Sequence, residues 1–268
     1  PYFSIVYRNS TGLENTWTYY SQNAGRAGTG SVNLFSGNLT WIHADAGITN
    51  GAMGVSINHV YNANDKETDI GYGNGWRLNY VQELVKEEIS TTSGDMTYYR
   101  LTDGDGTRHW YKHDTGRKYV NEINKDTTLT IHDDHTATLK DKGDAAMTFA
   151  LDGSDARGRL TEIADAAGNK TLIVYTSNTT DTDGNLTETA VRDLRVASVQ
   201  EALNGQTEGQ SVSFSYNTEN RLSKITPPDG LETEYTYTDG NLSSITYKDS
   251  KTAVYTYNDT NLLTSAKN

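Results

Sequence analysis

Residues 220–225 are Asn-Arg-Leu-Ser-Lys-Ile, and residues 240–245 are Gly-Asn-Leu-Ser-Ser-Ile. A third, shorter copy begins at Thr260 and continues Asn-Leu-Leu-Thr, so that leucines stand 20 residues apart at positions 222, 242 and 262. Self-similarity at a fixed short period is typical of repeat proteins, in which each repeat is one small supersecondary unit. The repeat therefore decides the fold prediction before any local propensity is considered.

A Tyr-x-Tyr segment forms the second half of each unit. It occurs at residues 235–237 and again, 20 residues later, at residues 255–257. Residues 211–216 alternate serine with Val, Phe and Tyr, and this period of two indicates a strand with one buried face. Turn sequences such as Asp239-Gly-Asn241 separate the strands. A single two-stranded unit cannot bury its apolar face, so we expect the units to stack into one sheet.

The N-terminal half shows a similar pattern with less regularity. Residues 54–61 alternate, and residues 98–111 predict a hairpin about the turn at residues 103–106. The sequence of residues 186–203 is ambiguous, because helical and strand spacing both fit, and the repeat favours a strand for its second half.

These patterns predict an all-β fold of stacked β-hairpin repeats that form a spiralling open sheet. We expect residues 1–115 to form an N-terminal β segment and residues 116–268 to form the hairpin repeats, continuous with the first segment. The last copy stops at Asn268 before its Tyr-x-Tyr half, so we expect the sheet to be open there.

The composition agrees with this fold and argues against several functions. The 18 tyrosines outnumber the 4 phenylalanines, and tyrosine suits half-buried sheet positions because its ring is apolar and its tip is polar. The net charge of −12 argues against binding nucleic acid or anionic membranes. With no cysteine, disulfides and thiolate metal sites are excluded. No apolar run approaches the roughly 18 residues of a membrane span.

The units resemble the YD repeats of Rhs and wall-associated proteins. Upstream, residues 31–39 resemble the entry motif of that family, residues 73–80 its Gly-Trp segment, and residues 99–107 its DGDG hairpin. The resemblance covers residues 17–268 in the family's order. Within the Gly-Trp segment, we expect Trp76 to fill the core, because neighbouring glycines let the backbone approach closely.

The resemblance implies a β-strand spiral that builds a large hollow shell. Bacterial shells of this kind can enclose a toxic C-terminal domain, and related animal shells of the teneurin kind belong to adhesion receptors. We therefore expect a structural segment of a bacterial secreted or cell-surface protein, whose partner is the rest of its own polypeptide, including further repeats and C-terminal cargo. Residues 228–231 only partly match the family's self-cleavage signature, so cleavage and toxicity are not expected.

Aromatic residues are the candidate ligand-binding residues of this sequence. Exposed aromatic rings can stack on sugars, and an exposed row would favour an alternative function as a glycan- or protein-binding adhesion module. The competing interpretation is that these rings are core residues or cross-strand pairs. The candidates are Trp17, Tyr19, Tyr20, Trp41 and Trp110.

We expect no metal, no cofactor and no catalysis. His132-Asp-Asp-His135 is the tightest cluster of potential metal ligands, but its spacing favours a solvated turn. The loops that begin at Asp103 and Asp181 resemble calcium loops, yet their twelfth positions are Asp114 and Arg192 instead of glutamate. We therefore favour plain Asx-Gly turns for both. The sequence has no nucleophile elbow or triad order, and no motif selects a carboxylate pair, so an enzyme is not expected.

Overall fold

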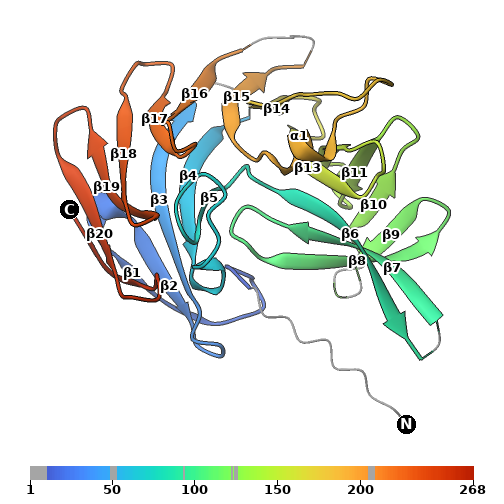
Figure 1. The fold of residues 1–268 in the computed structure, drawn as a ribbon, viewed down its shortest axis with the longest axis horizontal. Coiled ribbons are helices and arrows are strands. Elements are labelled where there is room, and N and C mark those ends of the chain that lie inside the picture. Colours follow the sequence, from blue (N-terminus) through green and yellow to red (C-terminus); the bar gives the residue numbers. More distant parts are fainter. Residues whose placement is uncertain (1–10, 49–52, 93, 122, 124–125, 205–208) are drawn as a thin grey trace.

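The computed structural model describes residues 11–48, 53–92, 94–121, 123, 126–204 and 209–268 of the chain (Figure 1). Nearly all of its regular structure is β-strand, which confirms the predicted all-β fold. An antiparallel small sheet comprises β1 (Tyr19–Asn23), β2 (Thr29–Asn33), β3 (Leu39–Ile48), β4 (Val55–Asn62) and β5 (Trp76–Leu78). Two short 3-10 helices, η1 (Gly25–Ala27) and η2 (Ala63–Asp65), interrupt this segment.

A second sheet of 16 strands begins with a closed ring. The ring strands are β6 (Glu83–Thr91), β7 (Gly94–Thr102), β8 (Arg108–Thr115), β9 (Lys118–Asn121), β10 (Thr128–Ile131), β11 (Thr136–Lys140), β12 (Ala146–Leu151) and β13 (Arg157–Ala164). Consecutive strands pair, and β13 then pairs with both β12 and β6, which closes the ring. Closure satisfies the edges that an open sheet would leave unpaired. Residue 115 lies at the end of β8, within this ring.

From β13 the same sheet continues outward as the repeat sheet. Its strands are β14 (Lys170–Tyr175), β15 (Val196–Ala202), β16 (Ser211–Tyr216), β17 (Leu222–Thr226), β18 (Thr233–Thr238), β19 (Asn241–Tyr247), β20 (Thr252–Tyr257) and β21 (Leu263–Lys267). A short helix, α1 (Glu188–Arg192), lies between β14 and β15. The strand predicted for the second half of residues 186–203 is therefore confirmed as β15, and the first half contains α1.

One face of the repeat sheet is apolar and buried. The repeat positions with no exposed surface are Leu160, Leu222, Ile225, Leu242 and Ile245. The sixth position, Ile163, is only partly buried. In four repeat pairs the register shifts beside the last tyrosine, and the following strand carries one extra residue there as a β-bulge. The bulge allows residues three positions apart, such as Leu242 and Ile245, to share the buried face.

The repeat tyrosines also connect one unit to the preceding one through their hydroxyl groups. Tyr175, Tyr216 and Tyr257 each donate a hydrogen bond of 2.8 Å to a backbone carbonyl of an earlier strand. The acceptors are Leu160, Val196 and Leu242. A tyrosine suits this position because its ring is buried while its hydroxyl satisfies a backbone group.

The last repeat places its buried leucine one residue later than the 20-residue step of the sequence. The turn before Leu242 is short, with positive φ at Asp239 and Gly240, whereas the turn of the last repeat is one residue longer and has positive φ at Asn261. Leu263, not Leu262, is therefore the buried residue that pairs with Tyr257.

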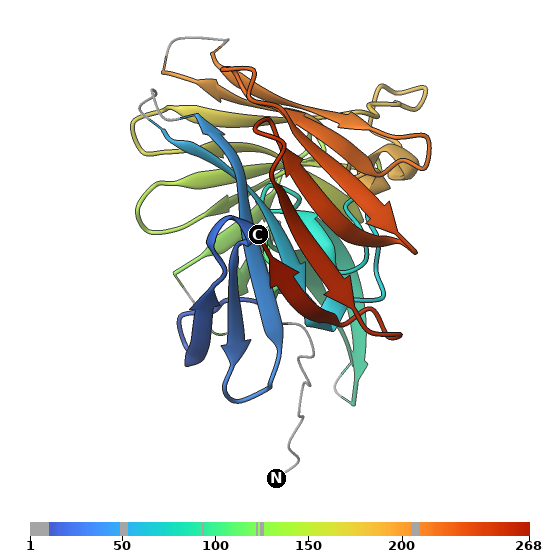
Figure 2. The same ribbon diagram turned by 90° about the vertical axis from the view of Figure 1, so that its left-hand side faces the viewer.

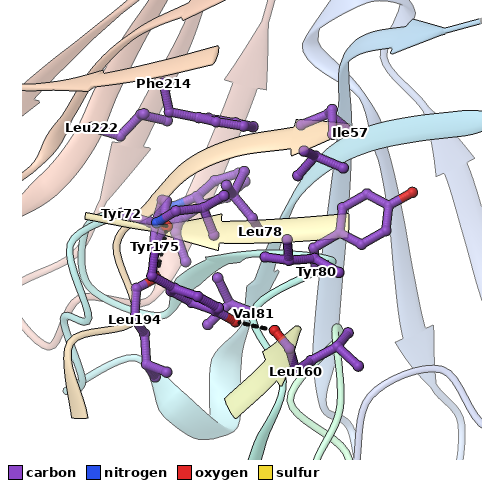
Figure 3. Close-up of a cluster of buried hydrophobic side chains, with 14 of the residues drawn as sticks. Ile57, Tyr72, Leu78, Tyr80, Val81, Leu160, Tyr175, Leu194, Phe214 and Leu222 are labelled. Carbon is purple, nitrogen blue, oxygen red and sulfur yellow. Dashed lines mark hydrogen bonds between the residues drawn. The ribbon is translucent and has the colours of Figure 1, made fainter. Parts of the chain in front are cut away.

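The repeat sheet curves around the small sheet (Figures 1 and 2). Trp76 of β5 is 1 % exposed and lies in the shared core, as predicted. Figure 3 shows part of this core, in which Tyr72 and Leu78 lie among Tyr175 and Leu222 from the repeat sheet. The N-terminal segment and the repeats thus share one hydrophobic core.

Candidate functional site

A groove of about 650 Å³ lies between the small sheet and the ring. Its apolar wall combines two strands of the small sheet with four strands of the ring. The residues of that wall are Ile42, Val60, Leu101, Tyr111, Leu139 and Met147. A mostly apolar groove with a few polar groups is the common form of a binding site.

A carboxyl–imidazole pair lines this groove. Asp103 Oδ2 lies 2.9 Å from His109 Nε2, and both side chains are less than one-third exposed. Asp103 Oδ1 accepts the backbone N–H groups of Asp105 and Thr107, so the DGDG turn orients the carboxyl group. The two residues come together because β7 and β8 form the predicted hairpin, with Thr102 paired to Arg108.

The surroundings shift the pKa of both groups. Burial raises the pKa of Asp103 to about 6, with the neighbouring Asp105 adding to the rise and the hydrogen bond from His109 opposing it. Burial alone would lower the pKa of His109, but the hydrogen bond and charge of Asp103 outweigh it and raise that pKa. Both pKa values are therefore raised, and perturbed pKa values occur at functional sites as well as in structural ion pairs.

The rest of the DGDG turn binds the chain's own N-terminal segment. Asp105 Oδ2 accepts the N–H of Leu13 at 2.6 Å, and Thr107 Oγ1 accepts the N–H of Gly12 at 2.7 Å. These hydrogen bonds, together with the backbone N–H groups that Asp103 accepts, give the acidic turn a structural role: it holds the N-terminal segment and its own loop in place. One polar atom of the groove wall, Gln82 Oε1, has no hydrogen-bond partner among the described residues. The described residues that line the groove show no organised set of reacting side chains.

The structure separates the five aromatic candidates. Trp17 is 39 % exposed and its ring is stacked on that of Phe35 at 5.1 Å, while Tyr20 is 65 % exposed. Tyr19 is half-buried, and its hydroxyl donates to the carbonyl of Gly12 and accepts the N–H of Glu14. These three residues lie on or next to β1, so they share one edge of the small sheet.

The other two candidates are occupied by packing. Trp41 on β3 is half-buried, and its indole N–H donates to the carbonyl of Ala27 at 2.8 Å. Trp110 on β8 belongs to the other sheet and packs edge-on against Tyr98, with ring centroids 6.0 Å apart. The five residues do not form one aromatic row.

The candidate metal ligands form turns in the described structure. Asp103, Asp152, Asp165 and Asp181 each use Oδ1 to accept two backbone N–H groups of their own turn. This repeated Asx turn accounts for the calcium-like spacing. Within the described ranges, no group of three or more His, Asp or Glu side chains is arranged to hold a metal ion.

His132 and His135 point to different partners. His132 Nε2 lies 2.9 Å from Thr138 Oγ1, and His135 Nδ1 lies 2.7 Å from Asp155 Oδ1. The close spacing in the sequence therefore does not produce a shared site.

The pairing of Asp103 with His109 was not predicted from the sequence. The predicted hairpin was the available signal. Asp103 directly follows Thr102 and His109 directly follows Arg108, and Thr102 and Arg108 are paired across the hairpin, so the two side chains lie close together. A buried cluster about Asp45 was also missed, and its members are far apart in the sequence.

Comparison with family models agrees with this architecture. The RHS Repeat model matches residues 216–252, which include β17 to β19. The model of a domain of unknown function, DUF6531, matches residues 29–111, from the small sheet into the ring. No curated protein matches the chain. In the part of the chain that the structure describes, no helix has the length and apolar character needed to cross a membrane. The repeats, their period and the matched model identify the C-terminal part of the chain as RHS, or YD-type, repeats.

Proposed function

We propose that this chain is a structural shell segment of a large bacterial RHS protein that is secreted or displayed at the cell surface. In this proposal its partner is the remainder of its own polypeptide, and the shell encloses or displays a C-terminal effector. The main support is the one-sided repeat sheet. On β18, Thr233 and Tyr235 are buried whereas Glu234 and Thr236 are exposed, so the sheet has an apolar inner face and a polar outer face.

The strand order also favours a wall that can be lengthened. From β14 to β21 each strand pairs with its neighbours in the sequence, so a further unit can add beside the last one without rearranging the others. A sheet built in this way separates an inside from an outside. It is suited to enclosing other parts of the same polypeptide.

Cryo-electron microscopy of the full-length protein, isolated from its native host, tests this proposal. We expect residues 83–268 to form part of a continuous wall with the C-terminal region inside it or anchored to it. A C-terminal region that makes no contact with the wall would overturn it. Cell fractionation tests the location independently, and a full-length protein confined to the cytoplasm would contradict secretion and surface display.

We further propose that the chain does not act as an enzyme. Both Asp103 and Asp105 are engaged by backbone N–H groups, which supports a structural role for the most perturbed carboxyl groups of the groove. Assays with ester, glycoside and peptide substrates test this. Turnover that disappears in Asp103→Asn would show that the groove is catalytic.

The second candidate function is adhesion to a glycan or a cell-surface protein. The exposed Trp17–Phe35 stack, with exposed Leu34 beside Phe35, is the observation that favours it. Exposed apolar residues gathered in one place often mark interaction sites. Binding of the protein to a glycan array is the test, with Phe35→Ser as the variant and Leu231→Ser, an exposed residue on another surface, as the control. Equal binding by both variants would exclude this patch.

A further inference from the structure

A buried carboxylate lies between two histidines of the small sheet. The Asp45 side chain on β3 has no exposed surface, and neither has that of His43 or His59. His43 Nδ1 lies 2.8 Å from Asp45 Oδ1, and His59 Nδ1 lies 2.8 Å from Asp45 Oδ2. Buried charges are costly unless they are paired, so this cluster needs an explanation.

Two tyrosines of the repeat sheet complete the cluster. Tyr235 on β18 donates its hydroxyl hydrogen to Asp45 Oδ1 at 2.6 Å. The phenol oxygen of Tyr247 on β19 lies 2.7 Å from His43 Nε2, and the same hydroxyl donates to the carbonyl of Arg26 at 2.8 Å. The segment that matches DUF6531 and the RHS repeats therefore meet at buried polar atoms as well as at apolar side chains.

Counting hydrogens assigns the protonation of His43. Tyr247 has one hydroxyl hydrogen, and the Arg26 carbonyl can only accept, so that hydrogen lies between these two oxygens. The Tyr247 oxygen must then accept a hydrogen from His43 Nε2. An ionised Asp45 can only accept as well, so His43 Nδ1 also carries a hydrogen.

The charge of Asp45 is consistent with this count. Burial alone would raise the pKa of Asp45, but positive charge on the adjoining imidazole rings and the hydrogen bonds that both rings donate outweigh that effect and hold the pKa well below its usual range. Two further charged groups, Arg26 and Asp249, lie near Tyr247. The guanidinium group of Arg26 lies 3.7 Å from the centroid of the Tyr247 ring, and it pairs with Asp249 at 2.7 Å.

His59 has different surroundings. Its Nδ1 donates to Asp45, but its Nε2 is buried and has no hydrogen-bond partner among the described residues. Its ring is stacked on Tyr235 at 4.8 Å and meets the edges of Tyr72 and Trp76. A second positive charge would leave a buried N–H without an acceptor, whereas a neutral ring leaves only a lone pair.

We propose that His43 carries a hydrogen on both ring nitrogens and that His43, Asp45 and Tyr247 form a buried charged latch between the DUF6531 segment and the RHS repeats. The latch gives the DUF6531 segment a definite role, which is to hold the repeat sheet in place through the hydrogen bond from the charged His43 ring on β3 to Tyr247 on β19. His59 stays neutral beside it. The carbonyl of Arg26 and the hydroxyl of Tyr235 supply the remaining hydrogen bonds.

Nitrogen-15 NMR of the histidine rings in the intact chain at neutral pH tests the assignment directly. We expect both ring nitrogens of His43 to be protonated, and His59 to show one protonated and one bare nitrogen. The resonances are assigned from spectra of His43→Gln and His59→Gln. If one variant does not fold, the other still distinguishes the two rings in the wild-type spectrum. A bare nitrogen on His43 in the wild-type protein would overturn the proposal.

Two tyrosine variants separate the latch from general packing. Tyr247→Phe removes the oxygen that accepts from His43 Nε2, so we expect that nitrogen to lose its hydrogen. Tyr235→Phe is the matched control, because it deletes a hydroxyl that donates to Asp45 and not to His43, so His43 should keep both hydrogens. Hydrogen exchange then tests the mechanical role. Amides of β3 and β19 should exchange faster in Tyr247→Phe than in Tyr235→Phe, and equal exchange in the two variants would show that no latch exists.

Discussion

Trp76 donates its indole N–H to the phenol oxygen of Tyr257 at 2.8 Å, although 181 residues separate them. Tyr257 in turn donates to the carbonyl of Leu242. One hydroxyl group therefore connects the small sheet to two neighbouring repeat strands. This relationship shows how the repeats depend on the N-terminal segment for their buried hydrogen bonds as well as for their apolar contacts.

The first prediction concerns this hydroxyl group. Tyr257→Phe should lower the free energy of unfolding by about 1–3 kcal/mol, because it leaves a buried N–H and a buried carbonyl without partners. Urea unfolding measures the effect. Tyr20→Phe is the control, since Tyr20 is 65 % exposed. Equal stability of the two variants would show that the bond contributes nothing.

The second prediction concerns the repeat leucines. Leu242 is fully buried, so Leu242→Ala should cost about 2–5 kcal/mol of unfolding free energy through lost burial and a cavity. Leu231 is 52 % exposed, and Leu231→Ala should change the stability by less than about 0.5 kcal/mol. Thermal and urea melts of both variants compare them. A loss under about 1 kcal/mol for Leu242→Ala would show that the repeat face does not form a packed core.

The third prediction contrasts a buried carboxylate with an exposed one. Asp45→Asn removes the charge that compensates a buried imidazolium, and should cost about 3–5 kcal/mol of unfolding free energy. Asp249 forms an ion pair with Arg26 in which both side chains are nearly half exposed, so Asp249→Asn should leave the free energy of unfolding almost unchanged. Urea unfolding at neutral pH measures both. A small cost for Asp45→Asn would remove the energetic basis for the cluster.

The fourth prediction is a pH dependence at the groove. The pKa of Asp103 is about 6 in the folded chain, above the value of about 3.9 expected when unfolded, so its stabilising contribution is largest below about pH 4 and is lost as pH rises through 6. The pKa of His109 is also raised. Its contribution is present below about pH 6.5, the unfolded value, and is lost as the pH rises through the higher folded value.

Both contributions therefore fall as the pH increases. Urea unfolding midpoints between about pH 4 and pH 8 should show a weaker decline in Asp103→Asn than in the wild-type chain. Asp259→Asn, an exposed turn residue, is the control and should follow the wild-type profile. A wild-type profile with the same slope as Asp103→Asn would mean that the pair does not titrate in this range.

Local patterns predicted the strands well, because alternation and turn chemistry act over a few residues. The hairpin at residues 98–111 formed as expected, and so did the strand at residues 54–61. The shift from Leu262 to Leu263 shows the limit of a fixed period. A turn can gain one residue when an asparagine adopts a positive φ, as Asn261 does, and the buried leucine then moves with it.

The polar clusters could not be derived in the same way. Tyr235 and Asp45 are 190 residues apart, and their contact depends on how the repeat sheet curves around the small sheet. The closure of the ring between β6 and β13 likewise depends on the total twist of the intervening strands. Neither quantity is encoded in a short window of sequence.

The closure of that ring sets an order of events during synthesis on the ribosome. Glu83 of β6 pairs with Arg159 of β13, so one edge of β6 has no partner until about 76 further residues have been made. At 5–20 residues per second this is a delay of roughly 4–15 s. During that time β6 can pair only with β7, and its other edge is open to a wrong partner. Closure therefore removes the unpaired edges of the ring in the folded protein. Until β13 is synthesised, however, one edge of β6 stays exposed and can form wrong contacts.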